Sequence, residues 1–206
     1  MTLLKYVMVA LLMPISVLST SAWSDNTIVI VRHAEKPAMG LGQLTCQGLN
    51  RSLALAPVLL SRYGKPMAIY APNPSVLKKD KGIPYAYVRP LATIEPLAIR
   101  SGLPVHVEYG MTQVNQLATA LLAGPPGTRV VAWEHHWGET LARRLLARLN
   151  ANPDVVPKWA DSDFDSVYVI HIVDDPDGGR HPAFTHEQEG LNGLPDACAD
   201  VPANLH

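Results

Sequence analysis

Hydrophobic positions along the chain follow two patterns, one typical of buried strands and one typical of helices, and together they predict an α/β fold. Apolar runs typical of buried strands lie at 27–31, 67–70, 104–108, 128–133 and 165–173. Segments with the helical spacing of apolar residues lie between them, at 45–63, 90–101, 112–123 and 138–149. This alternation implies a mostly parallel central sheet with helices on both faces, a three-layer α/β/α sandwich.

Capping signals and apolar stripes refine the helices. Thr45 is a suitable N-cap for the first helix and Gly64 a suitable stop, whereas Pro57 predicts a kink or a break inside it. The stripe expected to face the core in this helix is Leu49, Leu53, Ala56 and Leu60. In the last helix the expected stripe is Leu141, Leu145, Leu146 and Leu149.

Two segments lack a regular pattern. Residues 73–88 are polar and rich in lysine, which favours a flexible, solvated loop, although Lys78, Lys79 and Lys81 are also suited to meeting an anionic substrate. Residues 174–206 are rich in Gly, Pro and Asp and are expected to form an irregular tail, with one short strand around Phe184.

Residues 1–24 have the layout of a secretory signal peptide. Lys5 precedes an apolar run over residues 6–18, and the small residues Ala22 and Ser24 suit cleavage before Asp25. The run is shorter than the roughly 20 residues that span a bilayer. We therefore expect a periplasmic or secreted protein whose single domain covers 25–206, with an uncleaved amphipathic anchor as the alternative.

Charge and cysteine content limit the partners and cofactors that we expect for this protein. The chain has 17 basic and 18 acidic residues, which favours neither nucleic acid nor a membrane surface as a partner after cleavage of the leader. In an oxidising compartment its two cysteines, Cys46 and Cys198, are expected to form a disulfide, with two free thiols as the alternative. Because the sequence has no HExxH motif and no paired-cysteine spacing, we expect no metal and no cofactor.

Polar side chains with phosphate chemistry follow the predicted strands. Arg32 and His33 come directly after the first strand, Arg89 stands at the start of a helix, and Glu134-His135-His136 follow the strand at 128–133. Ligands of parallel α/β sheets bind beyond the carboxyl ends of the strands. Arginine binds phosphate oxygens through paired hydrogen bonds, and a neutral histidine nitrogen can attack phosphorus.

Four motifs, in order, resemble the histidine phosphatase superfamily, which includes phosphoglycerate mutases. They are Val31-Arg-His-Ala-Glu35, Leu44-Thr45 followed by Gly48, Arg89-Pro-Leu-Ala-Thr-Ile-Glu-Pro-Leu-Ala98 and Val130-Val-Ala-Trp-Glu-His135. The resemblance implies a phosphoglycerate mutase-like fold and a phosphohydrolase whose nucleophile is His33. Arg32, Arg89 and His135 would bind the oxygens of a phosphorylated small molecule or a phosphoprotein.

The sequence offers two candidate carboxylates for the general acid that protonates the leaving group. Glu108 is the nearest equivalent of the family's carboxylate, and Glu134 is the second candidate, although strand alternation would point it away from His135. The sequence also departs from the family pattern at Ala34, at His136 and in the length of 73–88.

Three other functions follow from the same residues. A mutase is disfavoured because 110–127 is too short for a large lid. A phosphate-binding protein without catalysis and a metal-dependent hydrolase that uses the His135-His136 region remain alternatives.

Overall fold

The computed structural model describes residues 24–198, so the predicted signal peptide and the last eight residues lie outside the described part. Six strands form the central sheet in the order β5-β2-β6-β1-β7-β8. Their bounds are β1 Ser24–Arg32, β2 Ala68–Tyr70, β5 Val105–His106, β6 Gly127–Trp133, β7 Ser166–Asp174 and β8 Arg180–Gln188. The first four in this order run parallel, whereas β7 pairs antiparallel with β1 and β8 antiparallel with β7. The predicted mostly parallel sheet is confirmed.

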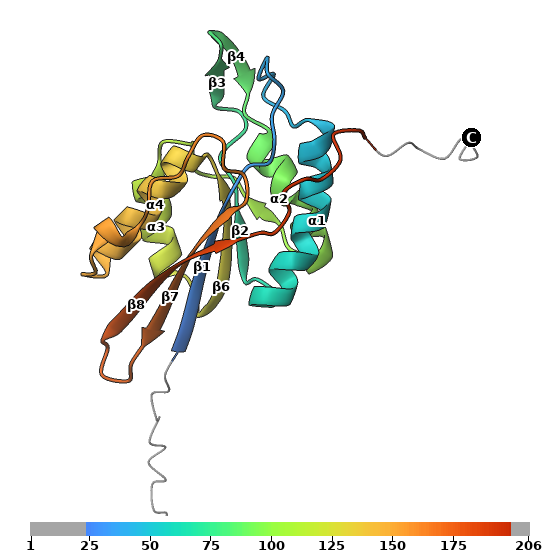
Figure 1. Cartoon of the computed structure of the whole chain (residues 1–206). Helices are drawn as coiled ribbons and strands as arrows, with labels where there is room; N and C mark the ends of the chain where they lie inside the picture. The colour runs from blue at the N-terminus through green and yellow to red at the C-terminus, as the bar shows by residue number, and fades with distance from the viewer. Residues whose placement is uncertain (1–23, 199–206) are drawn as a thin grey trace, which may run out of the picture.

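Helices cover both faces of this sheet. Figure 1 shows α1 (Cys46–Tyr63) and α2 (Arg89–Ser101) on one side and α3 (Val114–Ala123) and α4 (His135–Arg148) on the other. Strand alternation divides β1 between the two cores, since Ile28 and Ile30 pack with α3 and α4 while Val29 and Val31 pack with α1 and α2. The predicted three-layer architecture is therefore confirmed. A short 3-10 helix, Pro153–Val155, follows α4.

The predicted core face of α1 is confirmed at Ala56 and Leu60 and wrong at Leu49 and Leu53, whereas that of α4 is confirmed. Leu49 is 44% exposed and Leu53 is 54% exposed, because the helix buries the neighbouring stripe that includes Leu55 and Leu59. The helix also continues without a break through Pro57. The expected carbonyl partner of its missing N–H belongs to the exposed residue Leu53, where water can satisfy it. All four leucines of the α4 stripe are buried.

Two segments expected to be irregular form strands. Within 73–88, β3 (Leu77–Asp80) and β4 (Ile83–Ala86) form an antiparallel hairpin that projects beside the end of β1 (Figure 1). Within the expected tail, β8 is a nine-residue edge strand rather than a short one. Its side chains are mostly polar and exposed, so it lacks the apolar pattern of the central strands.

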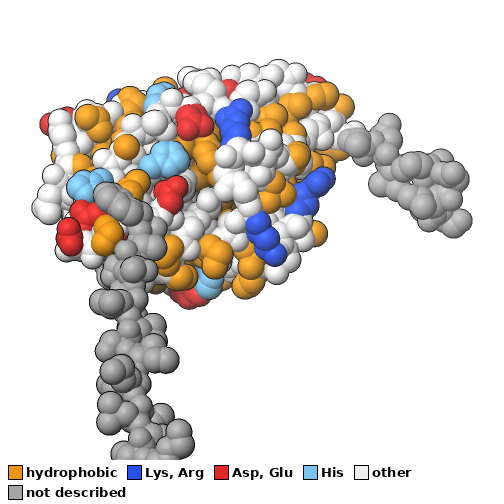
Figure 2. Space-filling view, turned by 90° about the horizontal axis from the view of Figure 1, so that it is seen from below, with side chains coloured by type: hydrophobic (Ala, Val, Ile, Leu, Met, Phe, Trp, Pro, Cys, Tyr) orange, Lys and Arg blue, Asp and Glu red, His pale blue; other side chains and the backbone are white. Residues whose placement is uncertain are grey.

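The last described residues return to α1. Cys198 forms a disulfide with Cys46, as the sequence predicts, and the bond joins positions 152 residues apart. Within residues 24–198, no helix is both long enough and apolar enough to cross a bilayer. Figure 2 views the molecule from the end at which β1 begins, where charged side chains are scattered among apolar and uncharged ones. The chemistry described next lies at the opposite end, where β1 and β6 finish.

Candidate active site

His33 lies immediately beyond β1 and is held as a neutral imidazole. Its backbone N–H donates to the carbonyl oxygen of Trp133 at 2.9 Å, which extends the pairing of β1 with β6 by one residue. The ring Nδ1 lies 2.8 Å from the carbonyl oxygen of Ala34. Because a carbonyl oxygen only accepts, Nδ1 carries the proton and Nε2 the lone pair. Burial lowers the pKa of His33 well below its ordinary value, and the charges of Arg89 and Arg32 also lower it.

Arg32 is fixed at one end of its guanidinium and free at the other. Nη1 donates to the carbonyl oxygens of Ala160, Asp161 and Asp163 at 3.3, 2.8 and 2.7 Å. The guanidinium carbon lies 3.8 Å from the ring centroid of Phe164. Nε is buried and has no hydrogen-bond partner among residues 24–198. The edge formed by Nε and Nη2 therefore presents parallel N–H donors to a ligand.

Arg89, the first residue of α2, has the same arrangement. It is 0% exposed, and its Nη1 donates to Asp80 Oδ2 at 2.7 Å and to the carbonyl oxygen of Gly40 at 3.1 Å. Nη2 donates to Asp80 Oδ1 at 3.3 Å, and Nε again has no partner in the described chain. Burial works against the charged form of Asp80, but the Arg89 guanidinium outweighs it and lowers the pKa of this carboxyl. Asp80 thus fixes Arg89 and leaves its Nε–Nη2 edge available.

Glu134 and His135 meet at the start of α4. The helix begins at His135 rather than near Gly138 because Glu134 caps it, with Oε2 accepting from the backbone N–H of Trp137 at 3.2 Å. His135 Nδ1 lies 3.0 Å from Glu134 Oε1, and its Nε2 lies 2.7 Å from Asp161 Oδ1. The expectation that alternation would point Glu134 away from His135 was wrong, since the strand has already ended at Trp133.

Glu134 is a carboxylate and not a carboxylic acid at neutral pH. Its burial favours the neutral form, but the contact with His135, the Lys78 ammonium and the N–H of Trp137 together lower its pKa to about 2. Glu134 therefore lies in the site as a hydrogen-bond and proton acceptor.

The structure does not bring Glu108 to the other predicted site residues. Glu108 follows β5, and β2 and β6 lie between β5 and β1, a separation of about 14 Å at the usual strand spacing. Its side chain is 60% exposed, and Oε1 lies 3.0 Å from His106 Nδ1, a contact that lowers the pKa of Glu108. Glu108 therefore lies three strand positions from β1 in the sheet order, away from His33.

Sequence reasoning named Lys78 only as the alternative to a solvated loop, and it missed Tyr87, Asp161 and Phe164. The hairpin brings Lys78 to within 4.0 Å of Glu134 Oε1, so its loop is not simply solvated as expected. Tyr87 contributes a buried ring that lies edge-on to His33, with centroids 6.0 Å apart. Asp161 and Phe164 arrive from the segment before β7. No local pattern marks these side chains, because each reaches the site through contacts distant in sequence.

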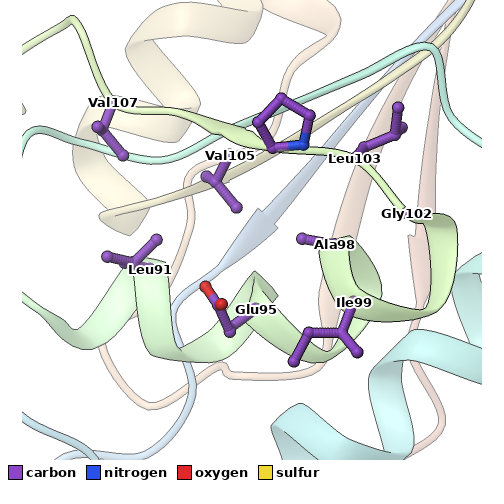
Figure 3. A pocket seen from close by; sticks show the side chains of 9 residues that line it. Leu91, Glu95, Ala98, Ile99, Gly102, Leu103, Val105 and Val107 are labelled. Atoms are coloured by element: carbon purple, nitrogen blue, oxygen red, sulfur yellow. The ribbon is translucent and has the colours of Figure 1, made fainter.

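Two cavities of similar size differ in character, since one is lined by polar side chains and the other mostly by apolar ones. A cavity of about 440 Å³ lies beside Arg32, the residue before His33, and is lined by Arg32, Lys36, Pro37, Ala38, Glu134, His135, His136, Asp161 and Phe164. A second cavity of about 400 Å³ lies between α2 and β5 (Figure 3). Aliphatic side chains such as Leu91 and Val105 line it, with Glu95 its only charged lining residue among those described. Of these two cavities, the first alone combines cations, imidazoles and carboxylates.

Three of its residues could also hold a metal ion. Ligand atoms of Glu134, His135 and His136 all lie within 4.8 Å of one another. His136 Nε2 lies 3.4 Å from Asp161 Oδ1, which is a fourth candidate ligand atom nearby. The turn capped by Glu134 places both histidines on the same cavity.

Comparison with known proteins gives the fold. No family model and no curated protein matches the sequence. One similar solved structure is the protein histidine phosphatase SixA complexed with tungstate, with a TM-score of 0.51 and 16% identity over 79% of this chain and 97% of that one. A second is mycobacterial hydrolase 2, with a TM-score of 0.52 and 13% identity over 87% of this chain and 94% of that one. A third is a candidate phosphohistidine phosphatase SixA from Nakamurella multipartitia, with a TM-score of 0.50 and 16% identity over 79% of this chain and 95% of that one. The chain has the fold of the histidine phosphatase superfamily, as the motifs around His33 predicted.

Proposed function

We propose that this protein is a phosphohydrolase that transfers a phosphoryl group to His33 and then to water. The observation that carries the proposal is the Nε2 lone pair of a neutral, buried histidine beside two arginines whose Nε–H groups have no partner among the described residues. The structural neighbours that are phosphohistidine phosphatases support a phosphatase of this kind.

Unpaired donors in this site indicate the type of ligand. Among the buried side-chain nitrogen and oxygen atoms of residues 24–198 that lack a hydrogen-bond partner, three belong to Arg32, Tyr87 and Arg89. A buried polar group without a hydrogen bond costs about 1–3 kcal/mol, so such a concentration in one place needs a cause. A phosphoryl group, with several oxygen acceptors and negative charge, supplies the missing partners.

The reaction follows from these positions. His33 Nε2 attacks phosphorus, the bond from phosphorus to the leaving oxygen breaks, and that oxygen leaves with the electron pair and takes a proton from solvent. The Nε–Nη2 edges of Arg32 and Arg89, with His135, hold the other phosphoryl oxygens. Water then attacks the phosphohistidine, the P–N bond breaks and the electron pair returns to Nε2.

We assign Glu134 rather than Glu108 to proton transfer. Glu134 lines the cavity and is ionised, so it can accept a proton from the attacking water. A group with a pKa of about 2 cannot donate a proton efficiently at neutral pH. We therefore expect the enzyme to prefer substrates whose leaving group departs readily as an anion.

A hydrolysis screen tests the proposal. Purified protein and His33→Ala are assayed against phosphomonoesters, phosphoanhydrides and phosphoproteins from pH 4 to 8. We expect phosphate release by the wild type and a loss of at least about 10³-fold in His33→Ala, with normal folding. His181→Asn is the control, since that exposed histidine contacts only Asp175 among the interactions described. Equal rates in His33→Ala and the wild type would contradict the mechanism.

The Glu134-His135-His136 cluster supports one second candidate, a metal-dependent hydrolase. Activity that is lost on chelation, restored by added metal and unaffected by His33→Ala would establish it in place of the phosphohistidine route. Tight phosphate binding without turnover would instead indicate a binding protein on this fold.

We also propose that the protein is exported. The signal-peptide pattern of residues 1–24 and the disulfide between Cys46 and Cys198 both support an oxidising compartment. Fractionation of cells that express the full chain tests this. We expect a mature form that begins near Asp25 outside the cytoplasm, and an unprocessed cytoplasmic protein would contradict it.

A further inference from the structure

Tyr87 places a hydroxyl in the site that nothing in the described chain satisfies. The residue follows β4 and is 1% exposed, and its Oη has no hydrogen-bond partner in residues 24–198. Its ring lies at 89° to the imidazole of His33 and 5.0 Å from the guanidinium carbon of Arg89. Two other tyrosines behave differently, since the partly buried Tyr63 donates to Glu187 and the buried Tyr168 donates to the carbonyl oxygen of Pro157.

Lys78 reaches the same place from the neighbouring strand of the hairpin. Its Nζ lies 4.9 Å from the centroid of the Tyr87 ring and 4.0 Å from Glu134 Oε1. The adjacent Lys79 points to the other face of β3 and is exposed. The hairpin therefore directs Lys78 and Tyr87 towards His33 and leaves Lys79 and Lys81 exposed to solvent.

Both side chains are suited to a negatively charged ligand. Burial raises the pKa of Tyr87, so its hydroxyl stays protonated and acts as a donor rather than as an acid. Burial lowers the pKa of Lys78, while Glu134 opposes this shift. An ammonium group that is partly removed from water interacts more strongly with a phosphoryl group than an exposed one does.

We propose that Tyr87 and Lys78 complete the phosphoryl-binding site, with Tyr87 Oη donating a hydrogen bond to a phosphoryl oxygen and Lys78 Nζ pairing with its charge. This inference rests on the proposed function and adds a second set of binding residues to the phosphoryl site. Arg32 and His135 bind from the strand ends, whereas Tyr87 and Lys78 bind from the hairpin. Because Asp80 pairs with Arg89, the same hairpin is fixed to the site by an ion pair.

Single-atom and charge substitutions test this role. Tyr87→Phe removes only the hydroxyl, and Tyr63→Phe is its matched control, because that hydroxyl bonds inside the protein away from His33. Lys78→Gln removes one charge, and Lys79→Gln is its control on the same strand. The readouts are kcat and KM for a phosphomonoester and, separately, the dissociation constant of inorganic phosphate measured by calorimetry.

A hydrogen bond to a charged ligand corresponds to about 10- to 100-fold in affinity. We expect Tyr87→Phe to lower kcat/KM and to weaken phosphate binding by about this factor. Its free energy of unfolding should be no lower than that of the wild type. Lys78→Gln should have a similar effect that shrinks at high salt and is partly rescued by Lys78→Arg. Tyr63→Phe should lose stability and keep its phosphate affinity, and Lys79→Gln should change neither.

The outcomes separate this inference from the proposed function. Unchanged phosphate affinity and kcat/KM in Tyr87→Phe and Lys78→Gln, in a protein that needs His33 for turnover, would overturn the inference alone. A protein that binds phosphate through Tyr87 and Lys78 but turns over no phosphorylated substrate would keep the inference and overturn the proposed hydrolysis.

Discussion

The pairing of Asp80 with Arg89 predicts a large loss of stability when the carboxylate is removed. Arg89 is 0% exposed and Asp80 is 8% exposed, and Asp80 accepts two hydrogen bonds from the guanidinium at 2.7 and 3.3 Å. Removing one partner of a buried ion pair typically costs about 3–5 kcal/mol, because the other charge stays buried without compensation. Asp80→Ala should therefore lower the free energy of unfolding by about 3–5 kcal/mol. Asp80→Asn keeps one acceptor oxygen and should cost less, about 2–3 kcal/mol.

Urea unfolding followed by tryptophan fluorescence measures both losses. Asp154→Asn is the control, because Asp154 is 88% exposed and lies 3.8 Å from Arg143, a surface pair worth about 0–1 kcal/mol. The total stability of a domain is about 5–15 kcal/mol, so the predicted loss is a substantial share of it. Phosphatase activity of folded Asp80→Asn should also fall, since Arg89 loses its support. A cost of under about 1 kcal/mol for Asp80→Ala would refute the reasoning.

Three further predictions concern other parts of the fold. Burial raises the pKa of Glu189 to about 8, so the folded state keeps a proton that the unfolded state releases above pH 4 to 5. The free energy of unfolding should therefore fall as the pH rises from 5 to 8, by at most about 4 kcal/mol. Glu189→Gln should abolish that slope in urea titrations at each pH, and an unchanged slope would contradict it. Reducing the Cys46–Cys198 bond should cost up to about 5 kcal/mol, because it closes a loop of 152 residues; equal urea midpoints with and without reductant would argue against this. Phe164→Leu removes the ring beneath Arg32 and should raise KM by about 3- to 10-fold with kcat little changed, and an unaltered KM would exclude a role for that contact.

Sequence patterns predicted those parts of the fold and site that depend on strong local signals. The β-branched run before Arg32 fixes the strand, and the two residues that follow it necessarily stand at its carboxyl end. Arg89 was found the same way, from its place before a clear amphipathic helix. The α4 stripe was correct because its leucines face one dense core.

The errors come from contacts that no local pattern contains. The position of Glu134 depends on its capping bond to Trp137, and Lys78 reaches the site only through the pairing of β3 with β4. The edge strand β8 was underestimated because one side of it faces solvent and Pro182 interrupts its pattern. Glu108 was assigned by analogy, and the strand order places it far from His33.

Trapping of a phosphorylated enzyme shows directly whether His33 accepts the phosphoryl group. Protein is mixed with a ³²P-labelled substrate, quenched in alkali, and the labelled peptide is identified, with His33→Ala and His181→Asn treated alongside. We predict a label that is stable to alkali, labile to acid and located on His33, present in wild type and His181→Asn and absent from His33→Ala. Label on another residue, or substrate turnover with the same label in His33→Ala, would contradict the phosphohistidine mechanism.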